Sequence, residues 1–432
     1  LTDTPMPDFE QVLSEHEEMQ DQLTSDYEMI SQIKTHPCIS ITTQDGRQIL
    51  SKDEYVACVI DVFNCPEEYR LSKAAGVKVR GNSTAEMEDE KPYRIKFDKK
   101  QNMLGLHNGE KYKSWVLLRS FWNLCPDYMA FSLAKPIFGD KYYSSDACYV
   151  NLYINGQDAG VYLLCEQNQV AEGRVDVNEA KKTETGTNIG YLVERDNYAN
   201  SAEHPFFSID YKGLPVTDIA GTTRVFKVHN YSIKSDINTQ EQVDFIRQYI
   251  INAFDILYEA AVNGRAIPGL TPKESVETVM DLESLANMLI IEELTHDYDV
   301  GGGSFYIAAD FSEGSSCPRL TFTAPWDFNF AYGGEPDAGF FACTFQDLVL
   351  NSDRSNPWFI VAMKADWFQE IVKQRWRELS ESGALVEKAE AVREEIKTLE
   401  NDLGDKQAKL RAGLRLVDFV RARINWLDSV WK

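Results

Sequence analysis

The spacing of hydrophobic positions changes along the chain, and this change predicts where helices and strands lie. Residues 8–34 carry apolar side chains at helical spacing in a polar, acidic background, which predicts an amphipathic helix packed on the outside of the protein. Between residues 38 and 196, short β-branched and aromatic runs alternate with turn residues, which predicts strands. The clearest hairpin signal is Asn155-Gly156, which stands between two such runs.

From Thr239 onward the apolar residues recur three and four positions apart, which predicts helices. The expected helical stretches are Gln242–Val262, Pro272–Glu293, Trp358–Leu379 and Val386–Trp431. Thr271 precedes a proline and is a suitable cap for the second stretch. Gly404 interrupts the last stretch within a polar loop, so we expect two packed antiparallel helices there instead of one long coiled coil.

An acidic segment lies between the second and third helical stretches. Asp297 and Asp299 precede a triple glycine, and Asp327 follows a tryptophan. The intervening runs Ser304–Ile307 and Leu320–Ala324 predict a hairpin, which would bring both acidic ends to the same edge of a sheet. Metal-assisted phosphoryl transfer needs one carboxylate near the attacking hydroxyl and another that holds the metal. A polar hairpin with acidic ends explains the same spacing without any activity.

Composition limits the classes of function. The 432 residues exceed the usual size of one core, so we expect two lobes or two domains. The hydrophobic content of 43% is that of a globular protein. A formal net charge of -24 argues against nucleic acid and anionic membranes as partners, and an anionic ligand such as ATP would need a local group of cations.

Other sequence features bear on metal sites, membranes and export. The eight cysteines form no CxxC pair and have no histidines at zinc spacing beside them, so we expect buried thiols and no structural zinc. No apolar run reaches the length of a membrane span. The first residues, LTDTPMPDFE, do not have the pattern of a signal peptide.

Cations concentrate around one predicted strand in the first half. The cluster comprises Arg80, Lys91, Arg94, Lys96, Lys99 and Lys100. On a strand, Lys91, Tyr93 and Ile95 share one face and Arg94 and Lys96 share the other. A lysine that projects from a strand toward phosphates is how protein kinases hold nucleotide, whereas a solvated basic edge strand is the simpler alternative.

These patterns together predict an α+β protein with two lobes. We expect an N-terminal helical extension over residues 1–36, a β-rich nucleotide-side lobe over 37–236, and a mainly helical lobe over 237–432. The acidic hairpin, residues 294–334, would lie where the lobes meet. Clefts between lobes are common places for ligands.

Five motifs in order give the chain a resemblance to a known family. RGNST, KPYRIKF, VNLYINGQDAGVYLLCEQ, THDYD and PWDFNFAYGG together resemble the CotH kinase family, named for a bacterial spore-coat protein. The resemblance implies a two-lobed, atypical protein-kinase-like fold. It also implies transfer of the γ-phosphoryl of ATP to Ser or Thr of a protein substrate, with Mg²⁺ or Mn²⁺. Many members are exported, so it implies an extracellular location or the cell or spore surface of a bacterium.

The resemblance assigns roles to particular residues. Asp299 corresponds to the aspartate that acts on the substrate hydroxyl, and Asp327 corresponds to the metal-binding aspartate. Asp297 is the alternative to Asp299, because the choice depends on matching THDYD to the family pattern T-K-N-x-D. The nucleotide-side motifs contain Arg80, Lys91, Lys96 and Glu166.

Three departures from the family pattern favour a second hypothesis. Asn329 stands where members often have a second acidic metal ligand, and it brings no charge. The segment Arg119–Tyr128 is shorter than usual, and Ser304 stands where ordinary kinases place a metal-binding Asn. The alternative is therefore a non-catalytic, pseudokinase-like surface or scaffold protein that binds a partner. A carbohydrate-binding module would need an exposed aromatic platform, whereas the aromatic residues here lie mostly within apolar runs.

Overall fold

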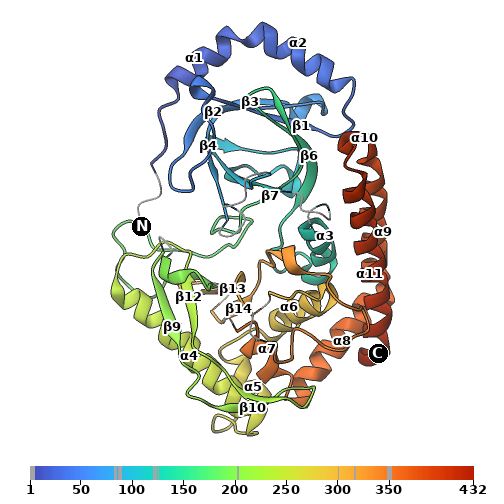
Figure 1. Cartoon of the computed structure of the whole chain (residues 1–432). Coiled ribbons are helices and arrows are strands. Elements are labelled where there is room, and N and C mark those ends of the chain that lie inside the picture. Colours follow the sequence, from blue (N-terminus) through green and yellow to red (C-terminus); the bar gives the residue numbers. More distant parts are fainter. Residues whose placement is uncertain are drawn as a thin grey trace.

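The computed structural model describes residues 5–81, 85, 90–119, 124, 126–201, 204–299, 301–315, 318–347 and 353–432. A barrel lies at one end of the molecule, and a second sheet with most of the helices lies at the other (Figure 1). The strands are β1 Cys38–Thr43, β2 Val56–Phe63, β3 Leu71–Val79, β4 Tyr93–Gln101, β5 Tyr112–Arg119, β6 Ala147–Ile154, β7 Gln157–Glu166, β8 Gly190–Arg195, β9 Phe206–Ile209, β10 Pro215–Thr217, β11 Thr223–Val225, β12 His229–Ile233, β13 Phe305–Asp310 and β14 Thr321–Phe322.

Helices occur at both ends of the chain and between the sheets. They are α1 Glu10–Glu18, α2 Gln20–Ser31, α3 Pro126–Phe138, α4 Gln240–Val262, α5 Pro272–Glu277, α6 Leu282–Thr295, α7 Pro357–Ala362, α8 Asp366–Ser382, α9 Ala384–Thr398, α10 Glu400–Leu403 and α11 Gln407–Trp431. The helices α9 and α11 run side by side along one side of the molecule, from beside the barrel to the level of α8 (Figure 1). None of the helices in the described ranges is long and apolar enough to cross a membrane.

The first sheet is a closed barrel of seven strands in the order β1-β2-β3-β4-β5-β7-β6. A parallel pairing of β1 with β6, with Cys38 opposite Asn151, closes the ring, and its other neighbouring strands are antiparallel. Inward side chains such as Ile95 on β4 and Trp115 on β5 fill the barrel with a core of its own. The alternation along β4 therefore places Arg94 and Lys96 on the outer face.

The second sheet joins distant parts of the sequence. Its order is β14-β13-β8-β12-β9, and β13 lies between β8 and β14. Phe305 is opposite Arg195 in this pairing, although 110 positions separate them in the sequence. Helices pack around the sheet in one continuous apolar core that also includes α3 and the outward residues Val116 and Cys165 of the barrel. This core connects the two sheets.

The expectation of two kinase-like lobes, β-rich first and mainly helical second, is wrong. The strands of the first half form a closed barrel, and the rest of the chain contains a five-stranded sheet together with its helices. Strands β8, β9 and β12, expected in the β-rich lobe, belong instead to the sheet that contains β13 from the later part of the chain, and β8 pairs with β13 directly. Period-two patterning identifies strands but does not specify which distant strand will be a neighbour. The domain boundaries at 36 and 236 stay a prediction.

Individual helices, strands and turns agree more closely with the predictions made from the sequence. Asn155 and Gly156 both have positive φ and form the two-residue turn between β6 and β7, as predicted. Thr271 caps α5 with a reciprocal hydrogen bond to Glu274. Gly404, at φ 58°, separates α10 from α11, which confirms the predicted interruption. The helix predicted over residues 8–34 is divided into α1 and α2 at Met19.

The six cysteines within the described residues are free thiols. They are Cys38, Cys58, Cys65, Cys148, Cys165 and Cys343. Burial raises the pKa of the Cys65 thiol, and it acts in the same direction on the others. The prediction of buried thiols is confirmed for Cys38, Cys58, Cys165 and Cys343, and Cys125 and Cys317 lie outside the described residues.

One buried ion pair fastens the start of the barrel to the C-terminal helices. The carboxylate of Asp402 accepts hydrogen bonds from Nδ1 of His36 and from the backbone N–H groups of Thr35 and His36, at 2.7 and 3.0 Å for the latter two. Burial alone would lower the pKa of His36, but hydrogen bonds to Asp402 and Glu395 raise it to about 9. His36 is therefore charged at neutral pH, where it is paired with Asp402.

We predict that Asp402→Asn lowers the free energy of unfolding by about 2 kcal/mol near neutral pH, because it removes the partner of a buried charged group. The raised pKa of His36 stabilises the folded state fully below its ordinary value of 6.5, and this stabilisation is lost as pH rises toward 9. Denaturant unfolding between pH 6 and 9.5 should therefore show a decline in stability that Asp402→Asn reduces, while the weaker contribution of Glu395 remains. The exposed neighbour Asp405 provides the control: Asp405→Asn should keep the decline, and an unaltered decline in Asp402→Asn would contradict the assignment.

Candidate functional site

The predicted hairpin is present and brings the two acidic ends together. Ile307 of β13 pairs with Phe322 of β14, so the residues before one strand lie beside those after the other. The N–H of Tyr332 donates to the carbonyl of Thr295 at 2.7 Å, and the N–H of Tyr298 donates to that of Phe330 at 3.4 Å. The chain around Asp299 therefore lies alongside the chain that follows Asp327.

Asp327 lies directly before a short 3-10 helix, Phe328–Phe330, in the left-handed conformation with φ 68°. One carboxylate oxygen accepts a hydrogen bond from Ser304 Oγ at 3.2 Å, and the other accepts one from Asn329 Nδ2 at 2.7 Å. Ser304 also has a positive φ, of 55°. Such conformations are costly for residues other than glycine and cluster at functional sites.

A residue far from the hairpin fixes the Asp327 turn. The N–H of Phe328 donates to Oδ1 of Asp127 at 2.9 Å, and Asp127 lies buried in the first turn of α3. Trp326 stacks on Phe131 of the same helix with ring centroids 5.4 Å apart. The residues directly before and after Asp327 therefore both contact α3, and these contacts fix the turn that carries Asp327.

Asp299 forms an ion pair with Arg354, and the side chain of Asp299 is 24% exposed. The glycines that follow make this approach possible. A Cβ on Gly301 would collide with the backbone of residues 354 and 355, and one on Gly302 would collide with the ion pair itself. The triple glycine therefore allows the segment containing Arg354 to lie against the aspartate.

Asp297 is in a different environment from Asp299. Burial and the negative charges of Asp327 and Asp127 raise the pKa of Asp297 well above its ordinary range. Burial also raises the pKa of Glu292 well above its ordinary range, and the charge and hydrogen bond of Asp297 act in the same direction. Asp297 and Asp299 therefore differ in burial and in partners, and the choice of Asp299 over Asp297 as the residue that acts on a substrate hydroxyl stays a prediction.

The predicted cations are in three different settings. The guanidinium of Arg80 lies over the Trp326 ring, 5.5 Å from its centroid, beside the Asp327 turn. Lys91 Nζ donates to the carbonyl of Ala85 at 2.7 Å. Lys96 is half-buried on the outer face of β4. Of these three, Arg80 has a contact that places it near Asp327.

Glu166 is fully buried at the end of β7 and is engaged within the protein. It accepts hydrogen bonds from Arg174 Nε at 3.1 Å, from His107 Nδ1 at 3.0 Å and from the N–H of Asp146 at 2.9 Å. These contacts connect three loops at one end of the barrel. They do not direct the carboxylate toward Asp327.

Sequence reasoning did not identify several residues that surround Asp327. Asp127 lies within the segment that departs from the family pattern, and Arg354 lies in a loop without a recognisable motif. Glu194 on β8 is near enough that the charge of Asp327 adds to burial in raising the pKa of Glu194, while Lys234 opposes this. The only sequence signal for Glu194 was an acidic residue at a strand end.

Comparison with known families settles the relationship of the chain. Residues 77–427 match the family described as CotH kinase protein, from within β3 to within α11. The chain belongs to the CotH kinase family. This confirms the resemblance found in the motifs. The comparison with curated proteins found no match.

The side chains around Asp327 in this CotH family member offer some, but not all, of the oxygen ligands that a hard divalent cation needs. Asp327, Asn329 and Ser304 offer oxygen atoms, which Mg²⁺ and Mn²⁺ prefer, once the Asn329 amide presents its oxygen. Within the ranges that the structure describes, no three His, Cys, Asp or Glu side chains are grouped as a metal site. Mg²⁺ commonly needs only one or two protein carboxylates when substrate phosphates complete its coordination.

We predict that Asp297→Asn stabilises the folded protein by about 1–2 kcal/mol at pH 7 without metal, because it removes an ionisable group from a buried acidic cluster. The raised pKa of Asp297 means that the wild-type folded state loses stability as pH rises above the ordinary carboxyl range, about 4. The gain in melting temperature should therefore shrink as pH falls toward 4. Asp337→Asn, an exposed change of equal charge, should leave the melting temperature nearly unchanged. A melting temperature lowered by Asp297→Asn would contradict the prediction.

Proposed function

We propose that this CotH family member transfers the γ-phosphoryl group of ATP to a Ser or Thr hydroxyl of a protein, with Mg²⁺ or Mn²⁺. The observation that carries the proposal is the hairpin β13–β14, which brings the segments of Asp299 and Asp327 to one edge within a chain of a kinase family. Phosphoryl transfer depends mainly on positioning and electrostatics, so two placed carboxylates and a nearby cation form a suitable minimal set.

In this proposal Asp327 holds the metal, and the neutral groups of Asn329 and Ser304 assist it. A bound divalent cation would bridge the phosphates of ATP and offset their charge. The hydrogen bonds from Ser304 and Asn329 orient the Asp327 carboxylate, and Asp127 fixes the following turn through the N–H of Phe328. Burial raises the pKa of Asp297, and the negative charges of Asp327 and Asp127 act in the same direction, which supports a region that attracts a cation.

Asp299 is proposed to accept a hydrogen bond from the substrate hydroxyl. It is more exposed than Asp297, whose side chain lies in the buried cluster. Arg354 holds the Asp299 carboxylate in one orientation through the ion pair. An incoming hydroxyl could then use the carboxylate oxygen that Arg354 leaves accessible.

The nucleotide-side residues are proposed to act in two ways. Arg80, over Trp326, is suitable for direct contact with phosphate, and Lys96 contributes positive charge from the outer face of β4. Lys91 and Glu166 would act indirectly, because each already bonds within the protein. Lys91 holds the carbonyl of Ala85, and Glu166 joins the loops at the barrel end.

The family relationship supports a protein substrate at an extracellular location or at a bacterial cell or spore surface. The charge of -24 makes a nucleic-acid substrate unfavourable. It also favours acceptor segments that are not themselves strongly acidic, since like charges repel on approach.

One observation favours the non-catalytic alternative. Asn329, which stands where a second acidic ligand is expected, donates to Asp327 and adds no negative charge. A weaker metal site would reduce phosphoryl transfer before it affected the binding of a protein partner. The experiments below distinguish the two functions.

We predict that Asp327→Ala and Asp299→Asn fail in different ways. Metal–ATP at about a hundred times its dissociation constant should stabilise the wild type by about 2.7 kcal/mol, which raises the melting temperature by a few degrees. Asp327→Ala should lose this shift, because the metal ligand is gone. Asp299→Asn should keep the shift but lose nearly all transfer of labelled phosphate to protein Ser or Thr, detected by mass spectrometry.

The outcomes separate the hypotheses. A wild-type protein that shifts with metal–ATP but phosphorylates neither itself nor a panel of acceptor proteins would favour the non-catalytic function. Full transfer by Asp299→Asn together with loss in Asp297→Asn would show that Asp297 is the acting residue. Asp337→Asn controls for the loss of one surface charge.

We predict that Asn329→Asp lowers the metal concentration needed for half-maximal nucleotide binding, because a charged oxygen replaces a neutral one. The substitution also removes the amide that donates to Asp327, so it should lower the melting temperature without metal and restore it when metal is added. Titration of Mg²⁺ and Mn²⁺ at constant ATP measures the first effect. A metal requirement that stays equal or increases would mean that Asn329 is not a ligand.

A further inference from the structure

Phe330 differs from the other aromatic residues of the segment that carries Asp327. Trp326, Phe328 and Tyr332 are buried, whereas Phe330 is 55% exposed. A 3-10 helix has three residues per turn, so the side chain of Phe330 points about 120° away from that of the buried Phe328 in the same helix. A single exposed phenylalanine is ordinary on a protein surface. The meaning of Phe330 therefore depends on what lies beside it.

The backbone places Phe330 beside the segment of Asp299. The carbonyl of Phe330 accepts a hydrogen bond from the N–H of Tyr298 at 3.4 Å, so bond lengths limit the distance between the Cα atoms of Phe330 and Asp299 to about 12 Å. Tyr298 is half-buried, and its ring centroid lies 6.1 Å from that of Phe341, which is also half-buried. Accessible aromatic side chains therefore accompany Asp299 at this edge of the site.

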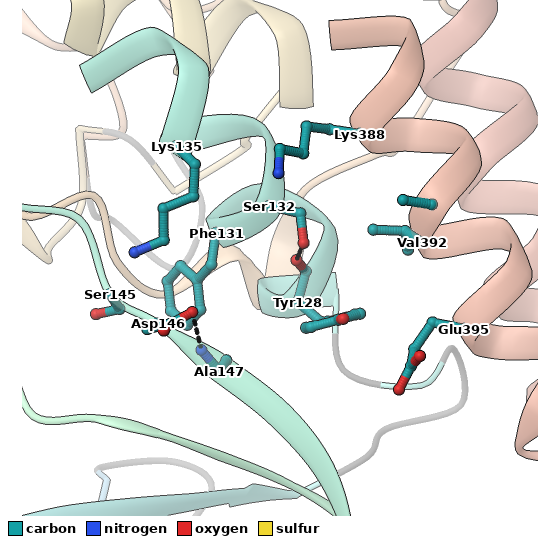
Figure 2. A pocket seen from close by; sticks show the side chains of 11 residues that line it. Tyr128, Phe131, Ser132, Lys135, Ser145, Asp146, Ala147, Lys388, Val392 and Glu395 are labelled. Atoms are coloured by element: carbon teal, nitrogen blue, oxygen red, sulfur yellow. Dashed lines mark hydrogen bonds between the residues drawn. The ribbon is translucent and has the colours of Figure 1, made fainter. Parts of the chain in front are cut away.

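The side of the Asp327 turn that carries Trp326 is occupied by other parts of the protein. The Trp326 ring stacks on Phe131 of α3, and the guanidinium of Arg80 lies over it. Phe131 also lines a cavity of about 280 Å³ between α3, the start of β6 and α9, so protein continues behind it (Figure 2). Arg80 is the cation proposed to contact phosphate, whereas Phe330 lies toward Asp299.

This arrangement separates the two substrates of the proposed reaction. In phosphoryl transfer the attacking and leaving oxygens lie roughly in line, on opposite sides of the transferred group. With the phosphates of ATP at Arg80 and the metal at Asp327, the acceptor hydroxyl at Asp299 lies on the side of Phe330. An extended acceptor segment rises about 3.3 Å per residue, so a residue within three or four positions of the hydroxyl can reach the Phe330 ring.

We propose that Phe330 determines specificity for the acceptor protein, by packing against an apolar side chain within four positions of the Ser or Thr that is phosphorylated. The inference rests on the proposed function and names a feature of its protein substrate. The exposed part of the Phe330 ring would leave water when the acceptor binds, and burial of apolar surface is favourable in proportion to its area. An acceptor with a polar residue at that position would lack this contribution.

The test uses synthetic peptides with one central serine in an alanine background and lysine at both ends. Leucine is placed in turn at each of the four positions on either side of the serine, and kcat/KM is measured with the full chain and metal–ATP. At least one leucine position should raise kcat/KM by about fivefold or more over the peptide without leucine. Phe330→Ser should reduce this ratio to about one, and Phe330→Leu should retain most of it.

The matched control is Phe206→Ser, because Phe206 is 43% exposed on β9, at the opposite edge of the second sheet from β14. It should keep the wild-type ratio. Peptide binding is measured separately by fluorescence anisotropy, with alanine in place of the serine so that no transfer is needed. The same leucine position should bind the wild type about fivefold or more tightly than it binds Phe330→Ser.

The outcomes distinguish this inference from the proposed function. Transfer to the peptides without a leucine preference, or with a preference that Phe330→Ser leaves unchanged, would overturn the inference alone. A leucine preference in binding that depends on Phe330, without transfer to any peptide, would support the inference as peptide recognition and contradict the kinase function. Loss of the metal–ATP melting shift in Phe330→Ser with an unchanged peptide preference would assign the ring to the nucleotide and overturn the inference. Absence of both transfer and peptide binding would overturn both.

Discussion

Mutual repulsion among buried carboxylates is the constraint on which the arrangement of this protein depends. Asp297 lies near enough to Asp127 and Asp327 that their charges, added to burial, keep its pKa high, and Glu292 shares that environment. Unpaired buried charge is among the most expensive features that a fold can contain. Groups that repel one another stay together only if the surrounding structure determines their positions. Here the antiparallel hairpin, the hydrogen bond from Phe328 to Asp127 and the packing of α3 supply that rigidity. Such local conflict within an otherwise consistent core is typical of a functional site.

The elements that could be predicted from the sequence are those determined by interactions between residues close together in the chain, such as turns and helix caps. Asn155-Gly156 gives the β6–β7 turn, since both residues adopt positive φ, and Thr271 begins a helix because its side chain satisfies a free N–H. The central hairpin could be predicted for the same reason, and with it the proximity of the Asp299 and Asp327 segments. The prediction of one helix over residues 272–293 was less accurate, because Asp281 caps a new helix after a short break. At the turn and at the two helix caps the deciding interaction lies within a few residues of the signal, and at the central hairpin it lies between two neighbouring strands of the chain.

The parts that could not be predicted depend on contacts between distant residues. Closure of the barrel requires β1 to pair with β6, and the second sheet requires β8 to pair with β13. An alternating strand pattern fits equally well beside many neighbours, so the sequence did not distinguish a closed barrel from an open lobe. The same limit applied at the site. Asp127 and Arg354 are brought to the aspartates by α3 and by a distant loop, and neither has a local pattern that indicates this. The assignment of Glu166 to nucleotide also relied on a motif, whereas its burial with Arg174 and His107 depends on the folded barrel end.

The difference between Asp297 and Asp299 shows what the folded environment adds to a motif. Both belong to the segment THDYD and are separated by one residue, so spacing does not separate their roles. The fold places Asp297 in the buried acidic cluster and Asp299 at its accessible edge, where Arg354 pairs with it. The triple glycine determines this division, because a side chain at Gly301 or Gly302 would displace the segment that carries Arg354. A buried acid with a raised pKa can contribute negative charge when a cation is bound nearby, while an accessible carboxylate can contact a substrate. The two aspartates are therefore suited to different tasks, and the glycines between them and β13 make both environments possible.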